Sequence, residues 1–379
     1  MLERVKDNAL SLSINKATGL SFSSTSKNIV SAGLSNSITT QIGIVTSNYN
    51  SELTNYLTSF NTRRVELNQT VQRELAIDPL YKGSRSQGVK LAKAYEKADI
   101  AMGGRGSGNW TDQDIQDIRN GEWVDGAEGH HINNVADHPT LQQDPDNIMY
   151  YRTREDHVKY GHNGDVNNES HGDLIDKNQM LKNTNKQRVI KNELRGLKLS
   201  AAIGMGVGFS LSFIAKLAER GINPETFGDS LFESIGAGLE SGVFSSASYV
   251  VGRAIQTGLV KAGLDLSTKV GSAISFASVG LAITLFASII QYIKLRRSGM
   301  DDSTALIETG KQALFSVSVM AVSVMAQGIY GGYAGLIVST AVGLMYFGYN
   351  IGKTIKQRQI DEKIRVYAIE QYRDIVANY

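Results

Sequence analysis

The sequence predicts a mostly α-helical protein with a small α+β insert, followed by a Gly-rich region of several transmembrane helices. Three observations lead to this fold class. All six histidines lie between His130 and His171, in a segment that reads as short strands and loops. Charged residues disappear over long runs beyond residue 199, as they do in bilayer-spanning helices. Before both regions, apolar residues recur at helical spacing.

The helical spacing lies in the N-terminal hundred residues, which are otherwise rich in Ser, Thr and Asn. It is formed by Leu53, Leu57, Phe60, Leu67 and Val71. A coiled coil would bury such a stripe, although Arg64 occupies one seam position. We therefore predict a helical arm over residues 1–100 that serves oligomerisation or partner binding. A homo-oligomer formed through this arm or through the transmembrane helices is expected.

Composition limits the remaining possibilities. A length of 379 residues suggests two or three domains, and a net charge of +2 is too small for the whole surface to capture nucleic acid. The chain has no cysteine, so metal ligands must come from His, Asp, Glu and Asn. No apolar core follows the first charged residues, so we expect no secretory signal and folding in the cytoplasm.

Residues 101–180 have the pattern of a small α+β unit. The segment from Thr111 to Asp114 has the form of a helix N-cap with a carboxylate at the third position, and Gly121 is placed to end that helix. A strand-turn-strand that holds Trp123 and a helix from about Thr153 are expected to follow. The strand segments are Glu128 to Ile132 and Asn147 to Tyr151, joined by a loop through Pro139 and Pro145.

Five of the histidines fall in one run of recognisable order. The run reads Glu128-Gly129-His130-His131-Ile132, then His138-Pro139, then Asp144-Pro145-Asp146-Asn147-Ile148, then Thr153 to Gly164 with His157 and His162. This order of His-His, Asn, His and His resembles that of the HNH (His-Me finger) endonuclease family. The residues around these positions are similar to those of the bacterial and phage branch of the family. The resemblance covers about residues 100–175 and implies a ββα-metal nuclease domain.

The resemblance also implies a role for each residue of the motif. His130 is a metal ligand, His131 is the general base, and Asn147 holds the loop that bears the base. His157 and His162 are the later metal ligands. Phosphodiester hydrolysis needs an activated water and a cation that stabilises the negative charge of the transition state. A neutral imidazole can accept the proton of the water near pH 7. One divalent ion is implied, with Mg²⁺ expected and Mn²⁺ or Zn²⁺ as alternatives.

One departure from the family pattern concerns His162. The family usually has three residues between the last two ligands, whereas four separate His157 from His162, so the two do not stack on one face of an ideal α-helix. Either Gly161 ends the helix and returns His162 to the site, or Asn163 or His171 serves instead.

Other side chains near the motif have two interpretations each. Glu128 is either a hydrogen-bond partner of a metal-bound histidine or a carboxylate at a strand end. Arg152 and Arg154 either contact substrate phosphates or cover the junction between strand and helix. His138 is expected to hold the loop, and His171 to be solvated.

An apolar region over residues 199–352 is predicted to cross the membrane about four times. A spanning helix needs about 20 apolar residues, and the expected spans lie near 199–215, 270–293, 313–329 and 332–352. The last two form a hairpin broken around Tyr330-Gly331-Gly332, and Gly204-x-x-x-Gly208 suits close helix packing. Residues 221–269 are expected as an external loop or a surface-lying helix. The alternative is a soluble, buried, Gly-rich bundle.

Basic clusters flank these runs and predict an orientation. They lie in a juxtamembrane linker over residues 181–198, at Lys294 to Arg297, and at the start of an amphipathic C-terminal helix over residues 353–379. Because positive loops prefer the cytoplasm, we expect a multi-pass protein of a bacterial inner membrane with the nuclease-like domain in the cytoplasm. The linker either binds nucleic acid phosphates or meets anionic lipid.

The sequence thus predicts a membrane-anchored HNH endonuclease that hydrolyses DNA, with defence against phage or conjugating DNA as the expected purpose. DNA and the lipid bilayer are the expected partners. A nuclease toxin or phage-ejected protein with a membrane-inserting region is one alternative. Another is a non-enzymatic helical membrane assembly whose histidines form a closed structural metal site.

Overall fold

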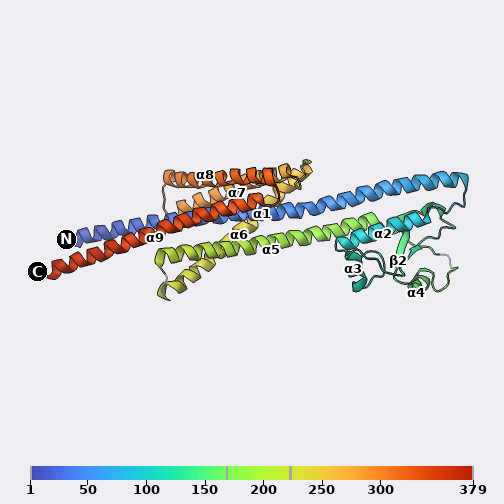
Figure 1. Ribbon diagram of the computed structural model, residues 1–379, viewed down its shortest axis with the longest axis horizontal. Coiled ribbons are helices and arrows are strands. Elements are labelled where there is room, and N and C mark those ends of the chain that lie inside the picture. Colours follow the sequence, from blue (N-terminus) through green and yellow to red (C-terminus); the bar gives the residue numbers. More distant parts are fainter. Residues whose placement is uncertain (1, 168–169, 222–223, 378–379) are drawn as a thin grey trace. The chain divides into compact units, whose positions relative to one another are not determined.

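The computed structural model of the protein describes residues 2–167, 170–221 and 224–377 (Figure 1). Most of these residues are helical, and the described strands form one two-stranded sheet, which confirms the predicted fold class. The chain divides into two compact units. Unit 1 comprises Met1–Asn48 and Leu194–Tyr379, and unit 2 comprises Tyr49–Glu193.

Unit 2 is an insert in the chain of unit 1. The chain enters it along α1 (Leu2–Ile77) and leaves it along α5 (Lys177–Arg220). The predicted boundary at residue 198 therefore falls inside a continuous helix. The N-terminal hundred residues likewise contribute to both units instead of forming one arm.

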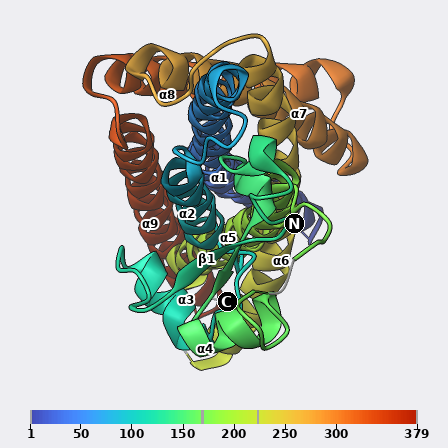
Figure 2. The same cartoon turned by 90° about the vertical axis from the view of Figure 1, so that its right-hand side faces the viewer.

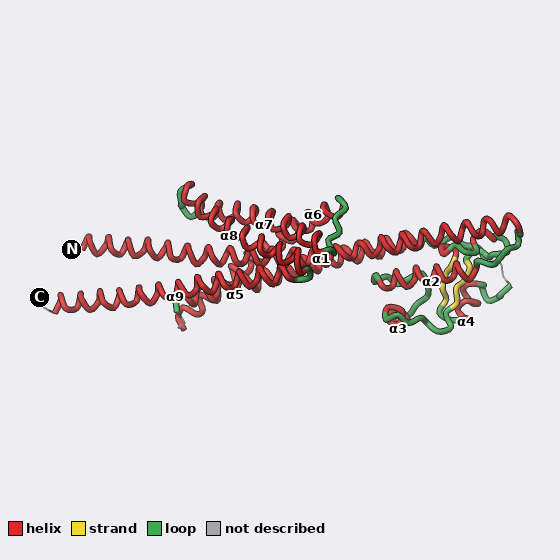
Figure 3. The backbone as a smooth tube through the Cα atoms, turned by 45° about the horizontal axis from the view of Figure 1, so that its top comes forward, coloured by secondary structure: helices red, strands yellow, loops and turns green. Residues whose placement is uncertain are grey.

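Short elements of unit 2 surround its two strands, as Figures 2 and 3 show. The helices are α2 (Arg85–Ala101), α3 (Asp112–Arg119) and α4 (Arg154–Asp156). The strands β1 (Glu128–His131) and β2 (Ile148–Tyr151) are antiparallel, with Glu128 opposite Tyr151 and His131 opposite Ile148. The remaining elements are two 3₁₀ turns, η1 (Pro139–Leu141) and η2 (Pro145–Asn147), and a π turn, η3 (His157–Gly161).

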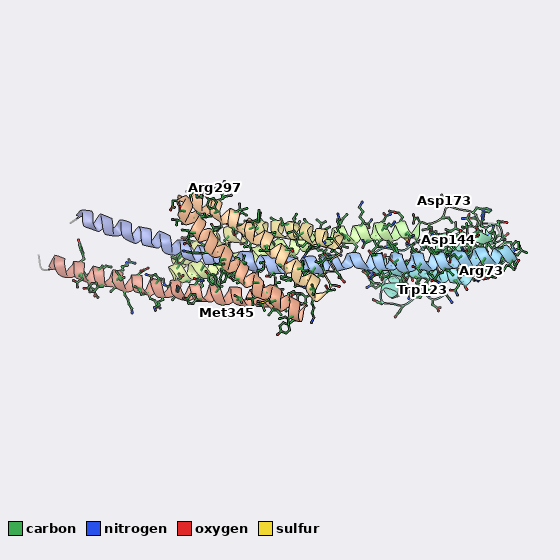
Figure 4. The ribbon with its side chains drawn as sticks, turned by 90° about the horizontal axis from the view of Figure 1, so that it is seen from above. Arg73, Trp123, Asp144, Asp173, Arg297 and Met345 are labelled. Atoms are coloured by element: carbon green, nitrogen blue, oxygen red, sulfur yellow. The ribbon has the colours of Figure 1, made fainter. Side chains whose placement is uncertain are left out.

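The start of α3 has the predicted capping box. The Thr111 hydroxyl accepts a hydrogen bond from the Asp114 amide, and the Asp114 carboxylate accepts one from the Thr111 amide at 2.9 Å. Gly121, just beyond the helix, has a φ of 101°, a conformation that favours glycine. Trp123, labelled in Figure 4, packs edge-on against Trp110 in the core beside the strands.

The apolar stripe of α1 packs within its own chain. Leu53, Leu57 and Phe60 lie against α2 and the first turns of α5, in a cluster with Tyr95 and Leu181. Intramolecular burial therefore accounts for the spacing that also suited a coiled coil. The polar seam residue, Arg64, makes ion pairs with another part of unit 2.

Unit 1 contains long helices built from small and apolar residues. Besides parts of α1 and α5 they are α6 (Pro224–Lys261), α7 (Lys269–Arg297), α8 (Asp302–Tyr330) and α9 (Ala334–Ala377). The helices α7 and α8 lie side by side (Figure 1). By length and composition, α5, α7, α8 and most of α9 could cross a membrane. Each of them contains one of the predicted spans.

Glycines shape unit 1 at the two predicted places. Gly331 and Gly332 have φ values of 71° and 56° and separate α8 from α9, so the predicted hairpin break is confirmed. Gly204 and Gly208 of α5 meet α6: a Cβ at Gly204 would lie 2.6 Å from the Ser241 carbonyl oxygen. Residues 224–261 form a helix that packs closely on α5, so of the two alternatives predicted for this stretch the structure has a helix and not a loop.

The burial pattern of unit 1 is the reverse of that of a soluble bundle. Thr40, Ser234 and Gln256 are fully buried, whereas Phe232, Leu314 and Met345 (labelled in Figure 4) are 76%, 70% and 66% exposed. Some of the buried polar groups bond across helices: the Gln256 amide donates to the Thr40 carbonyl at 3.1 Å and to the Ser275 hydroxyl at 3.0 Å.

Candidate metal centre

Three histidines of unit 2 meet at one point. His130 lies on β1, His157 begins the π turn η3, and His162 follows that turn. One ring nitrogen of each histidine lies within 4.8 Å of the others, and His130 Nδ1 is 3.1 Å from His157 Nε2. Two nitrogens that bind one tetrahedral ion at about 2.0–2.1 Å lie about 3.3 Å apart. The group therefore fits a metal ion with little movement.

The π turn explains how His162 reaches the group across four intervening residues. Bonding from residue i to i+5 accommodates one more residue per turn than an α-helix does, and the rings of His157 and His162 have centroids 4.9 Å apart. Gly161 leaves room for this turn, since a Cβ there would lie 3.2 Å from His130 Cγ. Asn163, by contrast, lies in the following turn with a φ of 52°.

Glu128 fixes the orientation of His157. Its carboxylate lies 2.7 Å from His157 Nδ1, and the hydrogen bond from His157 lowers the pKa of Glu128 below its usual value. An ionised carboxylate only accepts hydrogen bonds, so Nδ1 carries the proton and the lone pair of Nε2 points toward His130. This arrangement of carboxylate, histidine and ligand atom is common around protein-bound metals.

His130 is held neutral. Burial, followed by the neighbouring His157 and His162, lowers the pKa of His130 to about 4. At pH 7 the ring is therefore deprotonated at one nitrogen and can act as a ligand without competition from protons.

His131 lies on the opposite face of β1 from His130, because successive side chains of a strand alternate. Its Nε2 atom is 2.9 Å from the carbonyl oxygen of Gln142. A carbonyl oxygen can only accept, so Nε2 bears the proton and Nδ1 carries the lone pair. Burial lowers the pKa of His131, against the opposing effect of the bond to Gln142. The ring is thus a neutral base at pH 7.

Asn147 holds the loop between the two strands. Its side chain is fully buried, accepts from the Asn133 amide at 2.8 Å and donates to the Asn133 carbonyl at 2.9 Å. A third bond reaches the Leu141 carbonyl at 3.3 Å, next to the residue that binds His131. Asn147 therefore closes the loop over residues 132–147, which we call the base loop.

The other predicted residues lie around this site. Arg152 donates to Asp114 at 2.8 Å and so braces the start of α3, whereas Arg154 is 77% exposed beside Glu128. His138 and His171 lie together, with ring centroids 5.7 Å apart, and neither belongs to the three-histidine group.

Sequence reasoning missed the residues that support the base loop from other elements. Arg64 of α1 bonds to Asp144 and Asp146, and the backbone amide of Lys177 at the start of α5 donates to Asp146 Oδ1. Gly88 in the first turn of α2 admits the loop, since a Cβ there would lie 2.6 Å from Gln143 Cα. A glycine inside a helix disfavours the helix by about 1 kcal/mol relative to alanine, and that was the available signal.

Two short antiparallel strands, a helical turn and a three-histidine group are the arrangement that the resemblance to ββα-metal nucleases predicts. Residues 78–152 match a family described as GHH signature containing HNH/Endo VII superfamily nuclease toxin. The triplet Gly129-His130-His131 lies in the matched segment, and the match confirms the resemblance to HNH nucleases over this part of the chain. No curated protein and no solved structure matches the chain.

Proposed function

We propose that unit 2 is an endonuclease domain that hydrolyses DNA with His131 as general base and with one divalent ion on His130, His157 and His162. The observation that supports this most strongly is that the two adjacent histidines of β1, His130 and His131, have different surroundings. One histidine faces two others as a neutral ligand, and its neighbour, on the opposite face, is a neutral base fixed by a backbone carbonyl. A closed structural metal site would not need a neutral His131 held by the Gln142 carbonyl.

In this proposal a bound divalent ion supplies positive charge against the phosphate and the leaving 3′ oxygen. His131 accepts the proton of the attacking water at Nδ1, and the Gln142 carbonyl stabilises the resulting imidazolium through the proton on Nε2. Asn147 keeps the base loop closed during this transfer. Arg154 is the better placed of the two arginines to contact a flanking phosphate, because Arg152 is paired with Asp114.

The donor set bears on the choice of metal. Imidazole nitrogens suit zinc and other transition metals, whereas Mg²⁺ prefers oxygen ligands. Three histidines therefore favour Zn²⁺, and Mg²⁺ or Mn²⁺ would rely on added water and phosphate oxygens.

Plasmid cleavage by the detergent-purified protein tests the nuclease. We expect cleavage with at least one of Zn²⁺, Mn²⁺ and Mg²⁺, and none with EDTA, because removing the ion removes the charge that stabilises the transition state. A His157→Ala variant should lose both metal binding and cleavage. Tight metal binding by the folded protein without cleavage of any plasmid form, under each of these ions, would favour the structural site instead.

We also propose that unit 1 is embedded in a lipid bilayer. Many of its large apolar side chains face outward, and polar side chains such as Gln256 are buried and hydrogen-bonded inside. This distribution of side chains suits the hydrocarbon core of a bilayer, which offers no hydrogen bonds, so that polar groups must find partners within the protein. The flanking basic clusters would place unit 2 at the cytoplasmic face of a bacterial inner membrane.

Membrane extraction tests this part of the proposal. Membranes from expressing cells should keep the protein through washes with alkaline carbonate and with high salt, and detergent should release it. Release into carbonate without detergent would instead indicate a soluble bundle with buried glycines.

Two biological purposes are compatible with a tethered nuclease. Defence against DNA that enters through the membrane explains why the domain would be anchored. The description of the matched family, which names nuclease toxins, favours a toxin whose apolar unit inserts into a target membrane as the second candidate. The two differ in whether the chromosome of the producing cell is spared.

A further inference from the structure

We infer that Arg64 is a positioning residue for the general base, an inference that rests on the nuclease function proposed above. Arg64 lies on α1, outside the segment 78–152 that matches the nuclease family. It reaches the base loop from a helix that carries none of the motif residues. The catalytic unit of this chain would then extend beyond its recognisable nuclease segment.

The contacts of Arg64 join two carboxylates of the base loop. Its Nη2 atom donates to Asp144 Oδ1 at 3.2 Å and to Asp146 Oδ2 at 2.9 Å. The three side chains are only 24%, 23% and 13% exposed, so water screens the ion pairs weakly. Burial raises the pKa of Asp144, and the adjacent charge of Arg64 opposes that shift.

These carboxylates lie between the two residues that hold the base. Gln142, whose carbonyl binds His131, precedes Asp144 by two residues, and Asn147 follows Asp146 directly. Asp144 also accepts from the Asp146 amide at 3.0 Å and so forms the turn η2. This turn therefore adjoins both groups: it holds the Asn147 side chain on one side, and on the other it adds to the bonds of the Gln142 side chain with Tyr81 and Ser84 that hold the Gln142 carbonyl.

Asp146 connects the same turn to a second helix. Its Oδ1 atom accepts from the Lys177 amide at 3.1 Å, and its carbonyl accepts from the Ile175 amide at 2.8 Å. The turn is thus held from α1 by a side chain and from the start of α5 by its backbone.

Loss of Arg64 would leave two carboxylates two residues apart without their shared cation. Partly buried charges that lose their partner move toward water, and such movement would open η2 and displace the Gln142 carbonyl. A displacement of about 1 Å at a catalytic group can lower a rate about 100-fold. The three histidine ligands lie on β1 and around η3, outside the base loop, so metal affinity should not change.

The test compares Arg64→Ala and Arg64→Lys with Arg63→Ala, a matched control on the same helix. Arg63 is 48% exposed and bonds to Glu66 and Gln87, not to the loop. We expect Arg64→Ala to lower kcat about 10- to 100-fold with little change in KM for DNA or in the affinity for Mn²⁺. Arg64→Lys should recover part of the loss by restoring the charge, and Arg63→Ala should behave as wild type.

Hydrogen exchange supplies a readout that does not depend on cleavage. Arg64→Ala should speed exchange at the Asn133 and Asn147 amides, which the closed loop protects, relative to the amides of β1 and β2. Equal kcat and equal exchange in Arg64→Ala and Arg63→Ala would overturn the inference. If the wild type cuts no DNA, the proposed nuclease fails, and exchange still decides whether Arg64 holds the loop.

Discussion

Replacement of His131 by alanine is expected to lower DNA cleavage about 10²- to 10⁴-fold, which is the usual contribution of a positioned general base. Metal affinity should stay near that of the wild type, because His131 faces away from the three-histidine group and bonds to Gln142. Single-turnover cleavage of a labelled duplex, with metal binding measured by calorimetry, separates these effects.

Two comparisons make this result decisive. His130→Ala should lose metal binding, whereas His138→Ala, which changes a histidine outside the group, should retain both properties. A wild-type rate in His131→Ala would show that another group accepts the proton. Loss of metal in that variant would place His131 among the ligands.

The pH dependence of cleavage gives a second check on the same residue. In the proposed mechanism the neutral form of His131 is the base, and burial lowers the pKa of His131 below the usual 6.5. Activity should therefore persist as the pH falls below 6.5 and decline only when the pH passes through the lowered pKa. An acid limb with a midpoint above 6.5 would contradict this role.

The largest expected loss of stability follows Lys177→Ala. Lys177 and Glu96 are both fully buried, and Lys177 Nζ lies 3.0 Å from Glu96 Oε1 and 2.7 Å from Ser107 Oγ. Glu96 also accepts from Trp110 Nε1 at 3.1 Å. Burial alone would raise the pKa of Glu96, but Lys177 and these hydrogen bonds outweigh it, and its pKa lies below the usual value.

Removing one partner of such a pair leaves the other buried and uncompensated, at a cost of about 3–5 kcal/mol. Urea unfolding followed by tryptophan fluorescence measures this in unit 2, because the only two tryptophans, Trp110 and Trp123, both lie there. Lys182→Ala, at an exposed position of α5, is the control. Similar midpoints for the two variants would mean that the buried pair contributes little. The double variant Lys177→Met with Glu96→Gln should lose less stability than Lys177→Ala.

The parts of the fold that could be predicted depend on neighbouring residues. Short stretches of sequence are enough to predict the capping box at Thr111, the break at Gly331 and the order of the histidines. The role of Arg64 could not be read in this way. Its partners lie 80 and 82 residues away in the sequence. Within α1 alone, Arg64 is only a charged residue that interrupts an apolar stripe.

The same limit applies to the centre of the site. The spacing of His157 and His162 showed a departure from the family pattern, but only the packing of Gly161 against His130 shows that a π turn absorbs the extra residue. No motif in the sequence indicates that Lys177 and Glu96 are both buried. Likewise the sequence left a loop and a surface-lying helix open for residues 221–269, and the small residues that pack α6 against α5 did not reveal that contact.

The insertion of unit 2 between α1 and α5 also determines how proteolysis can act on this protein. A single cut in the nuclease-bearing chain, in either helix, leaves unit 2 covalently attached to unit 1 through the other helix. Only two cuts, one on each side, would liberate a soluble fragment. A processing protease that cuts at one site in either helix therefore leaves unit 2 joined to the apolar unit.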